Sequence, residues 1–365
     1  MQPCVLALVL LAAPAVHAPA RQALAQPRPR VEVAFVLDTT GSMGGLIDGA
    51  KRRIWSIARR IGEGRPRPEL AIALVGYRDR GDEYVTRVHD LSPDMDLVYE
   101  RLRAFQAGGG GDGPEHVSAA LDAAVHRVSW TRGPALRLIF LVGDAPPHLD
   151  YQDGFDYRDA TREAARLGIG VEAIQCGADA ATAAVWQEIA RGGGGHYARI
   201  DAQGGMPVRV TPVDAELARL NAELASTVVA GGSPAEQAEA GRRLESRVAM
   251  PAAMAVEAAS YFAGAAKLAD KDLVALPEAE QKRQLQALRA RPGSAPAALA
   301  GKSDAEAVRF LEEQKRRREH VQARILELQK QREAYLEQAA PARDGFDEQV
   351  VGTLRAKAAD VGIRY

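Results

Sequence analysis

Short apolar runs, separated by amphipathic segments, constrain the fold of this chain more than any other feature of its sequence. Four such runs lie in the first part of the chain, at residues 31–37, 70–75, 136–142 and 170–175. Strands that are apolar on both sides are typical of a parallel sheet with both faces covered. Between the runs, apolar residues recur at helical spacing, as at Ile47, Ile54 and Ile61. The alternation predicts an α/β fold, Rossmann-like, with a mostly parallel central sheet flanked by helices.

Weaker patterns complete this first unit, which we expect to span residues 31–212. Alternating residues predict short strands at 84–88 and 196–200, and apolar spacing predicts helices at 97–105, 117–125 and 181–190. Cys176 ends the fourth apolar run and is expected to be a small buried hydrophobe. With only two Cys in the chain, a disulfide scaffold and a Cys-rich zinc module are excluded.

The pattern changes after about residue 212, where Ala, Glu, Gln, Arg and Leu dominate and strand-like runs disappear. We expect 213–300 to be a helical, partly irregular connector and 301–365 to contain one long helix over 304–338. Apolar residues in that helix suggest a coiled-coil-like stripe, interrupted by Arg318 and Arg332; its members are Leu311, Val321, Ile325, Leu328 and Tyr335. Nearby acidic residues balance the basic run 315–318, which favours a solvated helix face over nucleic-acid binding.

The N-terminus has the pattern of a targeting segment. An apolar run at 5–16, followed by small residues, predicts a signal peptide over 1–25 and a short linker at 26–30. An uncleaved interfacial segment is the alternative. We therefore expect an exported protein, periplasmic or extracellular, with no membrane span after cleavage. The net charge of -1 provides no basic field for binding nucleic acid or an anionic membrane.

Polar side chains follow the first apolar run directly. Asp38, Thr40 and Ser42 alternate along this loop, which could direct one carboxylate and two hydroxyl groups to the same side. Ligand sets made only of oxygen suit a hard cation such as Mg²⁺, with Mn²⁺ or Ca²⁺ as alternatives. A helix cap would use the same residue types, so this loop alone is a weak signal.

Two further acidic loops strengthen the prediction of a metal site. Asp144 follows the third apolar run, and the glycine-rich segment 108–115 carries Asp112 and Glu115 just before a helix. In an open parallel sheet, ligands bind at the edge where the strands have their carboxyl ends. The three loops are therefore expected to meet at one edge, and three acidic loops together are harder to explain as caps.

The three loops together resemble a von Willebrand factor type A domain with its metal-ion-dependent adhesion site, of an exported bacterial group with a C-terminal helical extension. The resemblance implies that Asp38, Thr40, Ser42 and Asp144 hold the ion, directly or through water. Asp112 is the middle ligand favoured by motif position, and Glu115 is favoured by counting back from the helix. The resemblance also implies that an acidic side chain of a protein partner completes the shell.

Residues around these loops are candidates for contact with a partner. Related bacterial sequences suggest a rim role for Tyr77, Arg78 and Asp79, although a polar turn with a local ion pair is an equal alternative. We place two further residues at this partner-binding rim, namely Gly41 and Pro146. The tripeptide 80–82, Arg-Gly-Asp, is interpreted as a chance occurrence of an integrin-recognition motif. His148 is expected to be a surface residue and not a ligand.

The sequence favours a binding module over an enzyme. It contains no phosphate-binding loop, no Gly-x-Ser-x-Gly elbow and no His-Glu-x-x-His zinc helix. The expected partner is a protein that offers an Asp or Glu. Two alternatives are an assembly protein that self-associates through its helical tail and has a vestigial metal site, and a metal-dependent phosphoesterase.

Overall fold

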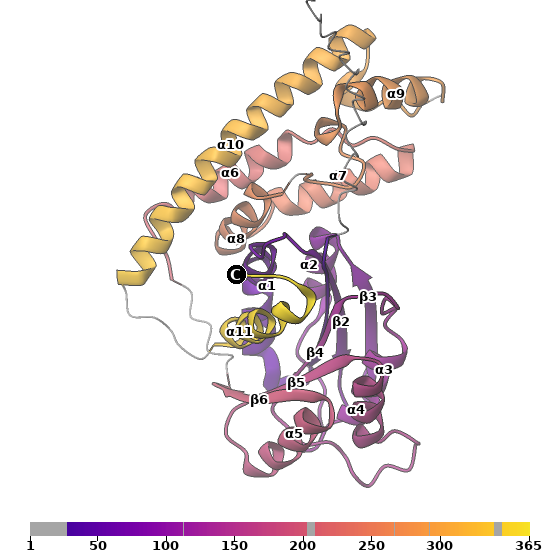
Figure 1. Cartoon of the computed structure of the whole chain (residues 1–365), viewed down its shortest axis with the longest axis vertical. Coiled ribbons are helices and arrows are strands. Elements are labelled where there is room, and N and C mark those ends of the chain that lie inside the picture. Colours follow the sequence, from indigo (N-terminus) through magenta and orange to yellow (C-terminus); the bar gives the residue numbers. More distant parts are fainter. Residues whose placement is uncertain (1–27, 112, 203–208, 266, 292, 339–344) are drawn as a thin grey trace, which may run out of the picture.

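The computed structural model describes residues 28–111, 113–202, 209–265, 267–291, 293–338 and 345–365. A six-stranded sheet in the order β3-β2-β1-β4-β5-β6 forms the centre of the first part (Figure 1). The strands are β1 (Arg30–Asp38), β2 (Glu69–Tyr77), β3 (Thr86–Ser92), β4 (Leu136–Gly143), β5 (Ile169–Cys176) and β6 (Gly194–Ile200). Only the edge strand β3 runs antiparallel to its neighbour. The predicted mostly parallel sheet is confirmed.

Helices cover both faces of this sheet. They are α1 (Gly44–Gly62), α2 (Met95–Ala104), α3 (Val117–His126), α4 (Tyr157–Arg166) and α5 (Ala180–Gly192), with a 3-10 turn, η1 (Gly41–Met43), before α1. Along β1, Val33 and Phe35 pack in one core with α1 and α2, whereas Ala34 and Val36 pack in the other with α3, α4 and α5. The sequence analysis missed α4, whose buried face is short and contains only Tyr157, Ala160, Thr161 and Ala164.

The second part of the described chain is helical and packs against α1 and α2 of the first part (Figure 1). Its helices are α6 (Asp214–Ser226), α7 (Pro234–Val248), α8 (Ala252–Ala263), α9 (Glu278–Arg289) and α10 (Asp304–Gln338), with 3-10 turns η2 (Leu273–Ala275) and η3 (Ala297–Leu299). Trp55 of α1 lies at the junction, where its ring centroid is 5.2 Å from that of Phe262 in α8. Aromatic packing therefore joins the two parts.

The long helix α10 occupies the predicted range, but its apolar stripe differs from the prediction. The stripe packs inside the chain against α6 and α8. Arg318 does not interrupt it, because this residue is only 4% exposed and its Nη1 lies 2.7 Å from Asp272 Oδ2. The interpretation of 315–318 as a solvated face is therefore wrong at Arg318. Tyr335 is 48% exposed and lies outside the buried stripe.

The last helix returns to the sheet, which the sequence analysis did not foresee. Helix α11 (Phe346–Ala358) and the turn η4 (Ala359–Val361) pack beside α1. The ring of Phe346 lies 5.8 Å from that of Phe35 in β1. Arg65 and Arg364 exchange backbone hydrogen bonds of 2.8 and 3.0 Å. The core under α1 is thus completed by residues from both ends of the described chain.

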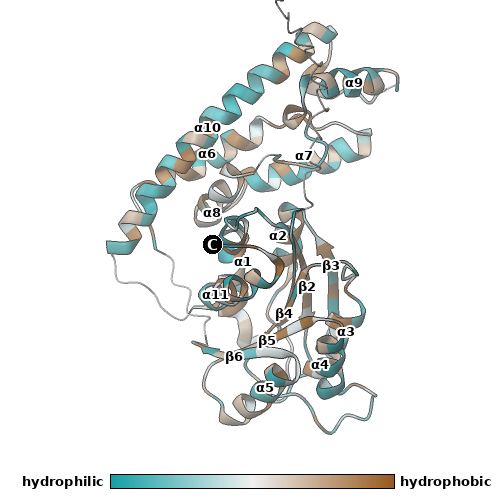
Figure 2. Ribbon diagram, viewed as in Figure 1, coloured by the Kyte–Doolittle hydropathy of each residue, from teal (hydrophilic) through white to brown (hydrophobic). Residues whose placement is uncertain are grey.

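The distribution of hydrophobic residues follows this architecture. In Figure 2 the inner strands β2 and β4 are mostly brown, whereas much of α10 is teal. Cys176 is buried, as predicted, and burial raises the pKa of its thiol. In the described part of the chain, none of the helices is both long and apolar enough to cross a membrane. The predicted signal peptide, 1–25, lies outside the described residues.

Candidate metal centre

Two neighbouring strands, β1 and β4, bring candidate ligands to the same edge of the sheet. Asp38, the last residue of β1, is paired with Tyr77 at the end of β2. On the other side of β1, strand β4 ends at Gly143, next to Asp144. A Cβ atom at Gly143 would overlap the Tyr77 hydroxyl and lie 3.1 Å from Asp38 Oδ2. Glycine at this position therefore leaves room for the side chains of both neighbouring strands.

The first loop holds the carboxylate of Asp38 with one of its oxygens satisfied. Asp38 Oδ1 accepts hydrogen bonds from the Thr40 backbone N–H at 2.9 Å and the Thr40 hydroxyl at 2.6 Å. The hydroxyl oxygens of Thr40 and Ser42 are 3.4 Å apart. Asp38 Oδ2 is buried and has no hydrogen-bond partner in the described structure. A buried acceptor without a partner is costly, so this oxygen is a candidate for contact with a ligand.

The electrostatics of Asp38 point the same way. Burial raises the pKa of Asp38 to about 7, and the nearby charge of Asp144 adds to the increase, although hydrogen bonds from Thr40 oppose it. Asp38 makes no ion pair with any residue that the structure describes. A cation supplied from outside the chain would favour the ionised carboxylate.

The middle loop places Glu115 against the first loop. The Glu115 N–H donates to the Pro146 carbonyl at 2.9 Å, and the Glu115 carbonyl accepts from the His148 N–H at 3.1 Å. A Cβ atom at Gly110 would lie 2.9 Å from Glu115 Oε1 and 3.2 Å from Thr40 Cβ. Glu115 is 4% exposed, and its Oε2 has no hydrogen-bond partner in the described structure. Burial, followed by the charges of Asp38 and other acids, raises the pKa of Glu115 to about 9.

The two candidates for the middle ligand thus differ. Asp112 lies outside the described residues, whereas Glu115 lies beside Thr40 with an unsatisfied oxygen. Asp144 is partly exposed, and its carbonyl accepts a hydrogen bond of 3.3 Å from the Thr182 hydroxyl. Its charge acts on the carboxyl groups of both Asp38 and Glu115. The described candidate ligands are therefore gathered at one edge.

The predicted rim residues do not all lie at a rim. Tyr77 is fully buried, and Arg78 and Asp79 are 7% and 6% exposed, so an open rim role does not fit these three residues. The Tyr77 hydroxyl is buried without a hydrogen-bond partner in the described structure, and burial raises its pKa. Gly41 is exposed and Pro146 partly exposed, as surface positions require.

The loop after β4 contains an aromatic cluster that the sequence analysis missed. The rings of His148 and Tyr151 stack with centroids 4.1 Å apart, and the Tyr151 hydroxyl donates to Asp79 Oδ2 at 2.7 Å. His116, at the start of α3, lies 2.7 Å from Asp153 Oδ2 through its Nε2. The His148 side chain is 7% exposed, so the expected surface position is wrong. The contacts of Tyr151 with Asp79 and of His116 with Asp153 span 72 and 37 residues, so they leave no local pattern to detect.

The donor set fits a hard cation without forming a complete cage. Among the described residues, no three or more His, Cys, Asp or Glu side chains form a group that could hold a metal by themselves. The edge offers instead the orphaned oxygens of Asp38 and Glu115 and the hydroxyls of Thr40 and Ser42. Mg²⁺ prefers such oxygen ligands and keeps several waters. The residues therefore fit a partly hydrated ion.

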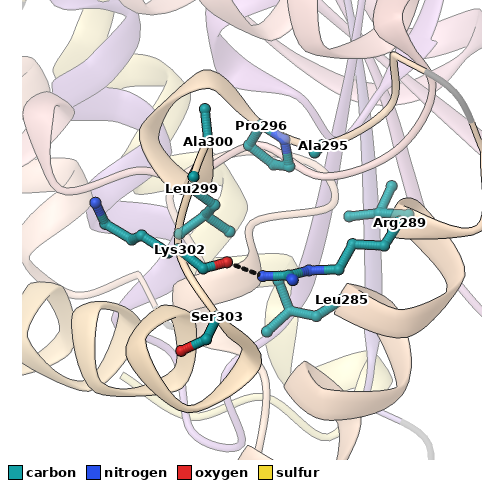
Figure 3. A pocket seen from close by; sticks show the side chains of 10 residues that line it. Leu285, Arg289, Ala295, Pro296, Leu299, Ala300, Lys302 and Ser303 are labelled. Atoms are coloured by element: carbon teal, nitrogen blue, oxygen red, sulfur yellow. Dashed lines mark hydrogen bonds between the residues drawn. The ribbon is translucent and has the colours of Figure 1, made fainter.

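A cavity elsewhere in the molecule offers different chemistry. About 350 Å³ in volume, it lies between α9 and η3 (Figure 3). Leu285, Pro296 and Leu299 contribute apolar walls, and Arg289 donates to the Lys302 carbonyl. None of the described residues that line this cavity is acidic. It therefore lacks the carboxylates that a hard-cation site requires.

Comparisons with known proteins find similarities to the first part of the chain. Residues 32–154 match the family described as von Willebrand factor A domain. Together with the observed sheet, this match supports a von Willebrand factor A domain in the chain. Von Willebrand factor A domain-containing protein 7 of Rattus norvegicus is 38% identical over 122 residues, covering 33% of this chain and 12% of the relative. The Homo sapiens protein of the same name is 36% identical over 122 residues, with the same shares covered.

Two solved structures are similar over about half of this chain. The SpRpn10 VWA domain has a TM-score of 0.36 and 11% identity, covering 48% of this chain and 89% of that one. Proximal thread matrix protein 1 from the mussel byssus has a TM-score of 0.38 and 14% identity, covering 48% and 42%. This chain spans only 12% of the length of the curated relatives named above.

Proposed function

We propose that this protein is a divalent-cation-dependent binding module for protein partners. Asp38, Thr40 and Ser42 would hold Mg²⁺ at the edge of the sheet, and Asp144 would contribute to its shell. The observation that carries the proposal is the Asp38 carboxylate, which is fully buried with one oxygen unpartnered and two hydroxyl-bearing residues next along the loop. Mn²⁺ and Ca²⁺ use similar oxygen ligands and are alternatives.

The middle loop would supply a further acid. The position of Glu115 beside Thr40 supports this residue, while Asp112 remains the alternative from motif position. Mg²⁺ exchanges some of its waters and is electrophilic toward oxygen anions. An Asp or Glu of the partner would replace a water and bridge the two proteins through the ion. The chain would therefore act by binding and not as an enzyme.

The family match supports the interaction role in general terms. A von Willebrand factor A domain suggests a protein-interaction or adhesion module. We also propose that the protein is exported, on the strength of the apolar N-terminal run, and that it meets its partner outside the cytoplasm. The packing of the α10 stripe within the chain argues against self-association through that stripe. The net charge of -1 argues against a nucleic-acid partner.

Calorimetric titration with Mg²⁺ and Mn²⁺ tests the metal site. We expect one saturable site that is lost in Asp38→Ala, because the substitution removes the buried carboxylate. Asp159→Ala provides a matched control, since Asp159 is an acid on α4 with a 70% exposed side chain. Intact binding in Asp38→Ala, or no heat and no thermal shift with either ion, would contradict the proposal.

Affinity capture tests the partner half of the proposal. A protein retained in Mg²⁺ but not in EDTA should bind Asp159→Ala and fail to bind Asp38→Ala. Substituting an essential acid of that partner should abolish capture. Retention that is equal in Mg²⁺ and EDTA would exclude the metal bridge.

A further inference from the structure

The turn after β2, residues 78–82, contacts all three loops that carry candidate metal ligands. We propose that this turn is the positioning element of the metal centre, holding the ligand loops in register while supplying no ligand itself. The proposal rests on the metal-binding function proposed above. It gives a role to Arg78 and Asp79, which the sequence placed at the rim, and to the tripeptide 80–82, which was interpreted as a chance motif.

Arg78 joins the first loop to the middle loop. Its Nε donates to the Thr39 carbonyl at 3.1 Å, and its Nη2 donates to the Gln106 carbonyl at 2.7 Å. The Gly108 N–H also donates to the Thr39 carbonyl, at 3.1 Å. The Arg78 guanidinium packs over the Tyr84 ring, 4.7 Å from its centroid. A buried planar group with several fixed donors holds backbone segments at defined distances.

Asp82 holds the glycine-rich segment in place through a second set of hydrogen bonds. Its Oδ2 accepts hydrogen bonds from the Gly110 N–H at 3.0 Å and the Asp79 N–H at 3.1 Å. A Cβ atom at Gly109 would overlap the Asp82 carboxylate, so the two groups are in close contact. Through this bond Asp82 keeps Gly110 above Thr40 and Glu115, the position described for the middle loop.

Asp79 and Arg80 fix the loop after β4, which begins at Asp144. Asp79 Oδ2 accepts from the Tyr151 hydroxyl and lies 3.4 Å from His148 Nε2. The Arg80 guanidinium lies 3.8 Å from the Tyr151 ring centroid and forms an ion pair with Asp153. His148 already stacks on Tyr151, so Arg80 and His148 must cover opposite faces of that ring. The Arg-Gly-Asp tripeptide is thus engaged within the fold at both of its charged residues.

Positioning through hydrogen bonds makes a different prediction from attraction through charge. Partners outside the coordination shell typically change metal affinity by about 10–100-fold when removed. Asp82→Ala removes the acceptor for Gly110, so we expect a loss of Mg²⁺ affinity of about 10-fold. Asp82→Asn keeps a carbonyl acceptor but removes the charge. We expect its affinity to stay within about threefold of the parent, because the hydrogen bonds survive.

The experiment combines Mg²⁺ titration with hydrogen exchange of the metal-free chain. Asp82→Ala should increase exchange at 107–111 and leave 148–153 unchanged. Arg80→Gln should increase exchange at 148–153 and leave 107–111 unchanged. It provides a second test of the proposal if Asp82→Ala does not fold. Parent-like Mg²⁺ affinity in Asp82→Ala, or unchanged exchange in both variants, would overturn the proposal. Equal losses in Asp82→Ala and Asp82→Asn would also overturn it and assign a direct charge effect. Failure of the parent to bind Mg²⁺ would instead overturn the metal site, and this proposal with it.

Discussion

Buried carboxylates at the sheet edge and in the helical region differ in whether they have an ion-pair partner. In the helical region, Asp272 faces Arg318 with a 2.7 Å contact, and Arg247 of α7 forms an ion pair with Asp96 of α2. At the sheet edge, Asp38 and Glu115 are buried near each other, neither forms an ion pair with a residue that the structure describes, and the charge of Asp38 adds to the raised pKa of Glu115. Asp272 and Asp96 are thus paired where they join helices, whereas Asp38 and Glu115 have no ion-pair partner in the described structure.

This difference distinguishes buried acids that stabilise the fold from buried acids that form a candidate binding site. A buried charge that is paired and hydrogen-bonded contributes to a fixed arrangement, and removing one partner exposes the cost of burying the other. In a cluster of buried acids without a cation, burial and mutual repulsion disfavour the ionised carboxylates. A bound metal ion would favour them by compensating their charge. Perturbed acids of this second kind are concentrated at functional sites in proteins.

Breaking the buried ion pair between Asp272 and Arg318 should have the largest effect on stability. We expect Arg318→Met to cost about 3–5 kcal/mol of the free energy of unfolding, because Asp272 would stay buried and unpaired. Arg162→Met, at an exposed pair on α4 with a 68% exposed arginine, is the control and should change stability by less than about 1 kcal/mol. Urea unfolding measures both. Similar costs in the two variants would remove the distinction between buried and exposed pairs.

Changing the pH should have an intermediate effect on stability, because Asp38 and Glu115 gain or lose protons. The raised pKa values of Asp38, about 7, and Glu115, about 9, mean that these groups bind protons more tightly in the folded chain than in the unfolded one. Their contribution to stability is therefore present at acid pH and is lost as pH rises through those values. Each pH unit between the unfolded and folded pKa of a group costs about 1.4 kcal/mol, so we expect the metal-free chain to lose several kcal/mol of stability between about pH 5 and 9.

Mg²⁺ and two substitutions sharpen this test. The cation should reduce the loss at high pH, because it stabilises the ionised carboxylates that the protons leave behind. Asp38→Asn and Glu115→Gln should each flatten the pH profile of the metal-free chain, as followed by urea unfolding in EDTA. A steeper decline in either variant would show that other groups govern the pH dependence.

The smallest expected effect concerns two neighbouring glycines of the middle loop at the sheet edge. Gly110 has φ +75 and its added Cβ would press on Glu115 and Thr40, whereas an added Cβ at Gly111 would meet nothing within 4 Å. We expect Gly110→Ala to cost about 1–3 kcal/mol and to weaken Mg²⁺ binding. Gly111→Ala should change both by little. Thermal unfolding and Mg²⁺ titration of the pair would contradict this view if Gly111→Ala proved the more damaging.

The sequence predicted the sheet and the position of its polar edge for physical reasons that act locally. Continuous apolar runs locate buried strands, and Asp38 and Asp144 are found by following those runs to their ends. The identity of the buried acids' partners could not be predicted in the same way. Arg318 looked like a break in an apolar stripe because its partner, Asp272, lies 46 residues away. The contact of Tyr151 with Asp79 spans 72 residues and likewise has no local signature.

The return of α11 to the sheet has a consequence for the order in which the chain can fold during synthesis. The strands and α1 leave the ribosome first, since synthesis proceeds from the N-terminus. Phe346, which packs on Phe35, emerges only after the whole helical region has been made. Until then one apolar face of the nascent sheet lacks its final cover, and completion of the first domain waits for the synthesis of α11.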